Sequence, residues 1–412
     1  MYLPLLTFLV GTCPLLGLAV PHAGVAQPRS SAIRGKYLVA IKPESSPAQL
    51  REHTSWVQGV HARNLRKRQS SGETAAGVER TFSFDGFRGY SGSFDEETLE
   101  DIKWSKEVAL VEPDQKLTLD SIQGDIAEAS SRSWGLDRIS HREPNNGTKY
   151  TYVSDPNATG RGQYVYVVDM GIQANHTEFE GRVIKGFNVW ENYTAFEDTF
   201  GHGTHVAGTI GDRTVGIAKD VTLVDVKAFW GANLAVNDIL KNGRANSYVI
   251  NMSFGYSEPP DITVELINAG VQPGSPWSRG SRKRQRFITD RTPGRVPNSF
   301  TVSASDRADN RVFFSNWGPG VDAFAPGFDI YSAWVGSNTS TCYLLSSTSM
   351  ATPHVAGLMA YLKAVHAEAP NISAAAITQR IKNLAPKGVI KDPRGSPNLL
   401  INNNSGAWRE AC

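Results

Sequence analysis

Alternating and helically spaced apolar residues over the first third of the chain predict a small α+β unit. Residues 36–42 (KYLVAIK) alternate as a strand does, and residues 46–64 carry apolar side chains at helical spacing. Residues 80–94 are again strand-like, residues 95–106 begin with acidic side chains suited to a helix start, and residues 108–119 end the unit as a strand. The resulting order, β-α-β-β-α-β, is that of a split βαβ fold.

Three apolar stretches further along the chain predict a second domain of strands and helices. Residues 163–172 (QYVYVVDMGI) form a β-rich run that includes Asp169 near its end. This is the pattern of a buried parallel strand that presents a carboxylate at its carboxyl end. The small and apolar residues 201–208 (GHGTHVAG) predict the start of a tightly packed helix. Residues 346–369 predict a helix that starts at a Ser/Thr cluster, with its body over residues 350–369.

Composition describes an ordinary globular chain and excludes a general nucleic-acid binder. Lys and Arg total 42 against 40 Asp and Glu, so the formal net charge of the 412 residues is only +2. Such a chain lacks the broad positive field that nucleic-acid binding requires, and we expect no nucleic-acid partner. Its length allows two or three domains.

The N-terminal residues 1–26 predict a secretory signal. Their apolar stretch is too short and too broken by Pro and Gly to span a bilayer, and it ends in small residues. An uncleaved anchor is the alternative. After signal removal, Cys342 and Cys412 remain, and they either pair or stay as thiols. Glycosylation acceptors of the N-x-S/T type, which fit a secreted glycoprotein, occur at Asn146, Asn157, Asn192 and Asn338.

The second domain combines a carboxylate, a histidine and a serine in three separate motifs. Asp169 follows a predicted strand, His202 opens one predicted helix, and Ser349 lies at the start of another. His202 and His205 have the spacing of metal ligands, but the Glu of the H-E-x-x-H zinc motif is missing between them. A neutral imidazole oriented by a carboxylate is instead a general base, and helix N–H groups beside a serine can hold an oxyanion. Each motif alone is explained by a turn or a helix cap, and together they predict nucleophilic catalysis.

The chain resembles fungal secreted subtilisin-like serine proteases of the proteinase K type, peptidase family S8. The resemblance rests on VVDMGI, GHGTHVAG, INMSFG and STSMATPHVAG. Residues 27–125, which contain GKYLVAIKP and VALVEPDQ, resemble the inhibitor-type propeptides that precede these enzymes. A stand-alone binding domain is the alternative for this segment. The peptidase domain would then cover residues 126–412.

This resemblance implies an α/β fold with a parallel central sheet flanked by helices, preceded by the α+β propeptide domain. It also implies a monomeric secreted endopeptidase that needs no cofactor for catalysis. Its partners would be protein and peptide substrates and its own propeptide as a transient inhibitor, with no membrane association after signal cleavage. Ser349 would be the nucleophile, His202 the general base and Asp169 the group that orients His202.

The resemblance assigns two further sets of residues. Ser253, Phe254 and Gly255 would form one wall of the first specificity pocket. Pro297, Ser299 and Asp322 would bind a structural calcium ion through main-chain oxygens and one carboxylate.

The chain also departs from the family pattern. Ser347 stands where the nucleophile motif has glycine, and a positive φ there would be strained. The stretch between Lys227 and Ser253 is shorter than usual, which affects the shape of the pocket. The A-A-G-N motif, whose Asn completes the oxyanion hole, is missing, and residues 270–287 (GVQPGSPWSRGSRKRQRF) take its place.

Two interpretations of that basic stretch follow. Either it is a functional loop of a catalytically impaired protease or binding protein, or residues 272–288 are absent from the working protein, for example as a retained piece of intron. The stretch is poorly suited to a core strand because Pro273, Pro276 and Gly280 interrupt it and several cations would be buried. We favour the second interpretation.

Overall fold

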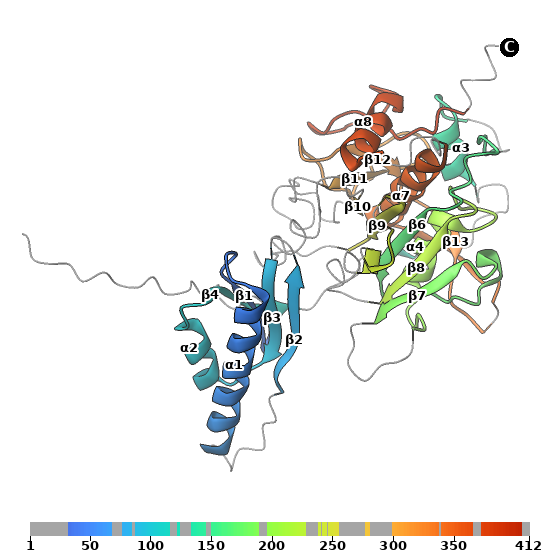
Figure 1. Cartoon of the computed structure of the whole chain (residues 1–412). Coiled ribbons are helices and arrows are strands. Elements are labelled where there is room, and N and C mark those ends of the chain that lie inside the picture. Colours follow the sequence, from blue (N-terminus) through green and yellow to red (C-terminus); the bar gives the residue numbers. More distant parts are fainter. Residues whose placement is uncertain are drawn as a thin grey trace, which may run out of the picture.

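The computed structural model contains a smaller N-terminal unit and a larger C-terminal unit (Figure 1). It describes residues 32–67, 76–84, 87–115, 122–123, 133–145, 150–188, 196–227, 238–239, 241–244, 246–254, 277–280, 299–337, 339–365 and 372–405.

The smaller unit has the predicted β-α-β-β-α-β order. Its elements are β1 (Ala32–Ile41), α1 (Pro47–Lys67), β2 (Gly77–Phe84), β3 (Phe87–Ser93), α2 (Glu96–Lys103) and β4 (Val108–Gln115). The strands pair antiparallel in the order β2-β3-β1-β4. Val57 of α1 and Ile102 of α2 are buried against Tyr90 of β3, so both helices supply the core of this unit.

The larger unit is built on a parallel sheet of seven strands. These are β6 (Tyr164–Asp169), β7 (Val183–Asn188), β8 (Thr222–Lys227), β9 (Tyr248–Met252), β10 (Trp277–Gly280), β11 (Phe300–Ser305) and β12 (Ala323–Pro326). They lie in the order β12-β11-β10-β9-β6-β8-β7. All residues of β9 and β11 are buried, as expected when helices cover both faces of a parallel sheet.

Two helices bring the predicted catalytic motifs to this sheet. They are α4 (His202–Gly211), which packs against β6 and β8, and α7 (Thr348–Val365), which lies across β9 to β12 (Figure 1). Helix α8 (Ala374–Leu384) packs against α7. A short 3₁₀ helix, η2 (Thr177–Phe179), lies beside α4. The predicted body of the third helix agrees with α7, whose described part ends at Val365.

A third sheet, which is antiparallel, joins the two parts of the chain. It consists of β13 (Ile330–Ala333), β14 (Cys342–Ser346) and β5 (Ile122–Gln123), in the order β13-β14-β5. Strand β5 follows the propeptide-like unit in sequence, yet it pairs with β14 of the larger unit. The connecting chain therefore reaches the residues that precede Ser349.

Part of the basic stretch lies in the central sheet. Residues Trp277–Gly280 form β10, where Ser278 is paired with Asn251 of β9 and with Phe300 of β11. The expectation that this composition does not suit a core strand is wrong for these four residues. Main-chain hydrogen bonds form whatever the side chains are, and a strand is needed to join β9 to β11. The rest of residues 272–288 lies outside the described residues.

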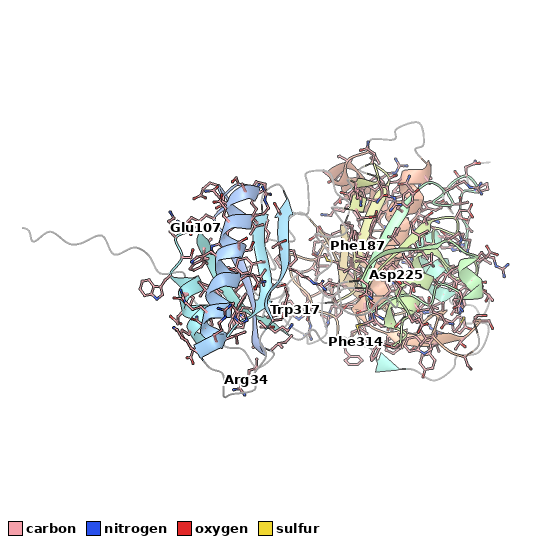
Figure 2. The ribbon with its side chains drawn as sticks, turned by 60° about the horizontal axis from the view of Figure 1, so that its bottom comes forward. Arg34, Glu107, Phe187, Asp225, Phe314 and Trp317 are labelled. Carbon is pink, nitrogen blue, oxygen red and sulfur yellow. The ribbon has the colours of Figure 1, made fainter. Side chains whose placement is uncertain are left out.

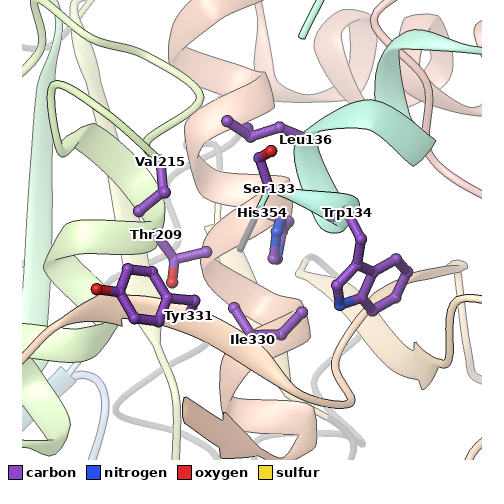
Figure 3. A pocket seen from close by; sticks show the side chains of 9 residues that line it. Ser133, Trp134, Leu136, Thr209, Val215, Ile330, Tyr331 and His354 are labelled. Carbon is purple, nitrogen blue, oxygen red and sulfur yellow. The ribbon is translucent and has the colours of Figure 1, made fainter. Parts of the chain in front are cut away.

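Helix α3 (Trp134–Ser140) anchors the start of the larger unit. A small pocket between α3, α4, β13 and α7 is lined by Ser133, Trp134, Gly135, Leu136, Thr209, Val215, Ile330, Tyr331 and His354 (Figure 3). A Cβ at Gly135 would lie only 2.8 Å from His354 Nε2, so this close approach of α3 to α7 requires glycine.

The second anchor of α3 is a buried ion pair. Arg138 Nε donates to Asp309 Oδ1 at 2.8 Å, and its Nη2 donates to Oδ2 at 2.9 Å. Both side chains are almost fully buried, with 2% and 4% exposed. The Nη1 group donates to the carbonyl of His141 at 2.7 Å, so the charges are paired and hydrogen-bonded.

Replacing only one partner of this pair should destabilise the larger unit. Arg138→Met leaves the Asp309 carboxylate buried without its cation, and we expect the free energy of unfolding to fall by about 3–5 kcal/mol. Urea unfolding of the chain in a Ser349→Ala background measures this without autolysis. The exposed pair of Arg161 with Asp220 provides the control. Arg161→Gln should cost less than about 1 kcal/mol, and equal losses for both variants would contradict the prediction.

Candidate active site

Asp169 and His202 meet where β6 ends and α4 begins. His202 Nδ1 lies 2.9 Å from Asp169 Oδ1 and 3.0 Å from Oδ2, and both side chains are buried. A carboxylate only accepts hydrogen bonds, so Nδ1 carries the proton and Nε2 has the lone pair. Among the residues that the structure describes, Nε2 has no hydrogen-bond partner. The imidazole therefore has the tautomer of a general base.

Close packing of main chain holds this pair together. A Cβ at Gly203 would lie 2.1 Å from the carbonyl oxygen of Gly171, so only glycine allows α4 to start this near the end of β6. Asp169 Oδ1 also accepts the N–H of Met170 at 2.8 Å, which fixes the carboxylate.

Asp198 holds the start of α4. This residue is not among those identified from the sequence. Its Oδ1 accepts the N–H groups of Phe200 and Gly201 at 2.9 and 2.8 Å. Its Oδ2 accepts the N–H and the hydroxyl of Thr204 at 2.9 and 2.8 Å. An Asp shortly before a helix start is a capping signal that could have identified it. The cap fixes the helix turn that carries His202.

Ser349 lies in the first turn of α7 and contacts the end of β9. It is the second residue of the helix, its side chain is buried, and its hydroxyl donates to the carbonyl of Ser253 at 2.8 Å. The structure thus brings the predicted nucleophile and the predicted pocket residue Ser253 together. Phe254, the next residue, is also buried.

Ser347 does not adopt the strained conformation expected for a residue in a glycine position. Six described residues other than glycine have positive φ, and Ser347 is not among them. Its hydroxyl oxygen instead accepts the N–H of Ser349 at 3.0 Å. The serine at this position is a helix cap and fits without backbone strain.

A second buried carboxyl group lies beneath Asp169. Asp225 of β8 is paired with Val167 of β6, lies inside the larger unit (Figure 2), and accepts the N–H of Ile172 through Oδ2 at 3.1 Å. Burial raises the pKa of Asp225 well above its usual range, and the charges of Asp198 and Asp169 raise it further. Through this hydrogen bond Asp225 holds the turn that follows Asp169.

His205 does not belong to the catalytic group. Its Nε2 donates to the carbonyl of Ile330 at 2.9 Å and lies 3.2 Å from that of Tyr343. Burial lowers the pKa of His205 to about 3, so the ring stays neutral. In the described part of the chain, no three His, Cys, Asp or Glu side chains form a metal-binding cluster.

The contacts of Asp322 do not fit the calcium ion that the resemblance implies. Asp322 Oδ1 lies 2.6 Å from the ammonium of Lys382 on α8, and its Oδ2 accepts the N–H of Thr301 at 2.7 Å. The ammonium also lies 6.0 Å from the ring centre of Phe300. A calcium ion on the same carboxylate would be repelled by this cation. Ser299 is buried beside this site.

Several predicted positions lie outside the described residues. They are Gly255, Pro297, Asn146, Asn192, Asn338 and Cys412, together with residues 1–26 and 228–237. Asn157 is exposed, as a glycosylation acceptor must be. Cys342 is partly buried. Within the described residues, no helix combines the length and apolarity needed to cross a membrane.

Comparison with known proteins identifies the fold and the chemistry. Residues 160–404 match the subtilase family, Peptidase S8, and residues 36–120 match the peptidase inhibitor I9 family. The chain belongs to the subtilase family. It is 41% identical to alkaline protease 1 of Aspergillus flavus over 96% of this chain and 98% of the relative. It is 40% identical to the subtilisin-like proteinase Mp1 of Magnaporthiopsis poae, over 94% and 96%.

Solved structures agree with this subtilase assignment. A cold-adapted subtilisin-like serine proteinase matches 66% of this chain and 97% of its own, with a TM-score of 0.57 and 32% identity. Fervidolysin from Fervidobacterium pennivorans has a TM-score of 0.68 at 19% identity, over 94% of this chain and 63% of its own, and supports the fold alone.

This protein is therefore a serine endopeptidase of the subtilase family that is preceded by an I9 propeptide domain. The comparisons do not support the alternative of a catalytically impaired protease or binding protein.

The pair of Asp322 and Lys382 should make stability independent of calcium at this position. We expect the response of the melting temperature to a chelator to be the same in the parent chain and in Asp322→Asn, and Lys382→Gln to lower the melting temperature by about 1–4 °C. Calorimetry of the Ser349→Ala chain with calcium and with chelator measures both effects. If the chelator destabilises the parent chain and Asp322→Asn removes that response, calcium binds at Asp322 and the prediction is wrong.

Proposed function

We propose that Asp169, His202 and Ser349 are the catalytic triad of this endopeptidase. The observation that supports the proposal most directly is the hydrogen bond from His202 Nδ1 to Asp169, which leaves the buried Nε2 as a base. Ser349 at the start of α7 supplies a hydroxyl beside the N–H groups of a helix terminus.

The chemistry follows from these roles. Ser349 Oγ attacks the carbonyl carbon of the scissile peptide bond while His202 Nε2 takes its proton, and Asp169 stabilises the resulting imidazolium. Main-chain N–H groups at the start of α7 stabilise the oxyanion. His202 then protonates the leaving amine, and water repeats the sequence on the acyl-enzyme. We further propose that Ser253, Phe254 and Gly255 border the bound substrate, because the carbonyl of Ser253 contacts Ser349.

A fluorophosphonate probe tests the triad. We expect it to label Ser349 in the processed protein, and both Ser349→Ala and His202→Ala should lose labelling and at least about 10⁴-fold in kcat. Ser346→Ala, three residues from the nucleophile in sequence, serves as the control and should keep its labelling. Labelling that survives Ser349→Ala would overturn the assignment.

We also propose that the enzyme is secreted as a zymogen and cuts its own chain just before Ile122. In β5, Ile122 pairs with Ser346 and Gln123 pairs with Leu345, antiparallel to β14. Ser346 is only three residues before Ser349. Proteases of this kind bind the main chain of a substrate as an added strand. Strand β5 is therefore placed as the segment that directly follows the cut bond and becomes the new N-terminus. The I9 match, which ends at residue 120, lies entirely on the N-terminal side of this bond.

This arrangement predicts the start of the processed enzyme. N-terminal sequencing of the secreted protein should find the first residue at Ile122 or within two residues of it, and the Ser349→Ala chain should remain joined. The propeptide should still co-elute with the enzyme soon after cleavage, because a domain that fits the active site also blocks it. A start more than two residues away from Ile122, or normal processing of Ser349→Ala, would contradict self-cleavage at this strand.

A further inference from the structure

Ser347 is firmly held two residues before the nucleophile. Its N–H donates to the carbonyl of Gly327 at 2.8 Å, and its own carbonyl accepts the N–H of Met350 at 3.1 Å. Only 1% of the residue is exposed. A Cβ at Gly327 would lie 2.8 Å from the Ser347 carbonyl oxygen, which shows how closely the neighbouring chain approaches. The main chain of Ser347 is therefore fixed, while rotation about its Cα–Cβ bond moves the hydroxyl.

The Ser347 hydroxyl accepts a hydrogen bond from a main-chain N–H group that the proposed reaction needs for the oxyanion. Its oxygen accepts the N–H of Ser349 at 3.0 Å. When Ser349 Oγ attacks a carbonyl, the N–H nearest to the developing oxyanion is that of Ser349 itself, in the first turn of an 18-residue helix. A single N–H makes one well-aligned hydrogen bond, so the Ser347 oxygen and the oxyanion compete for the same hydrogen.

We propose that Ser347 is a positioning residue that caps α7 in the resting enzyme and competes with the oxyanion for the N–H of Ser349. The inference rests on the proposed triad. As negative charge develops on the substrate oxygen, it makes the stronger, charge-assisted hydrogen bond and displaces the neutral hydroxyl. The Ser347 side chain rotates away, and no bond is made or broken in this step. The cap thus stabilises the helix start in the ground state and lowers the turnover rate.

Three possible roles of Ser347 predict three different values of kcat for the same variant. A cap without influence on catalysis predicts that Ser347→Ala lowers the melting temperature and leaves kcat unchanged. A hydroxyl that donates to the oxyanion predicts a fall in kcat. Our proposal predicts a lower melting temperature together with a higher kcat, because the N–H of Ser349 is released to the oxyanion.

The experiment compares processed parent enzyme with Ser347→Ala, Ser347→Thr and Ser373→Ala on a peptide amide substrate. Ser373 caps α8 in the same way, accepting the N–H of Ala376 at 3.2 Å, and serves as the matched control. We expect Ser347→Ala to raise kcat about 2- to 10-fold with little change in KM, the effect of losing one neutral hydrogen bond. Ser347→Thr keeps the hydroxyl and should show no such rise. Ser373→Ala should lower the melting temperature only.

A second measurement separates this inference from the assignment of the triad. The rate of inactivation by the fluorophosphonate probe should also rise in Ser347→Ala, because the phosphoryl oxygen of the probe gains negative charge at the same N–H in the transition state, before fluoride leaves. An unchanged or lower kcat in Ser347→Ala, with activity still abolished by Ser349→Ala, overturns the competition and leaves the triad intact. Activity that survives Ser349→Ala overturns the triad and this inference with it.

Discussion

The hydrogen bond between Asp169 and His202 is the interaction on which the rest of this site depends. Both groups are buried, so the carboxylate is stable there only if N–H donors satisfy it, and the imidazole keeps one tautomer only while the carboxylate holds Nδ1. The end of β6 must therefore lie against the start of α4. Gly203 has no side chain, which allows this close approach. Pairing with β8 and β9 on either side fixes the position of β6.

The starts of α4 and α7 both contribute to the proposed active site, and a side chain accepts main-chain N–H groups at each. Asp198 caps α4 with a full charge, and Ser347 caps α7 with a neutral hydroxyl. Our proposal gives this difference a catalytic reason. A charged cap at α7 would compete strongly with the oxyanion, whereas a hydroxyl satisfies the N–H of Ser349 and gives way when charge develops. At α4 the N–H groups have no catalytic role in our mechanism, so a strong cap is compatible with function.

The propeptide domain and the active site are connected through the sheet of β13, β14 and β5. Strand β14 leads directly into α7, so a segment that pairs with β14 is placed near the nucleophile by main-chain hydrogen bonds. The chain after the propeptide thus reaches the site without any special side chain. The register that brings Ile122 opposite Ser346 means that the proposed self-cleavage there needs no separate recognition motif.

By itself the sequence was enough to predict the propeptide topology, the strand that ends at Asp169, the helices that start at His202 and Ser349, and the endopeptidase chemistry. The topology and the positions of strands and helices rest on local periodicity, and the endopeptidase chemistry rests on the family resemblance that the short motifs carry. Only the tertiary structure decided which polar groups meet across long separations. The pairing of Asp322 with Lys382, the burial of Asp225 beneath the turn after Asp169, and the formation of β10 from a basic stretch each depend on partners far away in sequence. A local pattern does not report these contacts, because desolvation and strand pairing are properties of the packed chain.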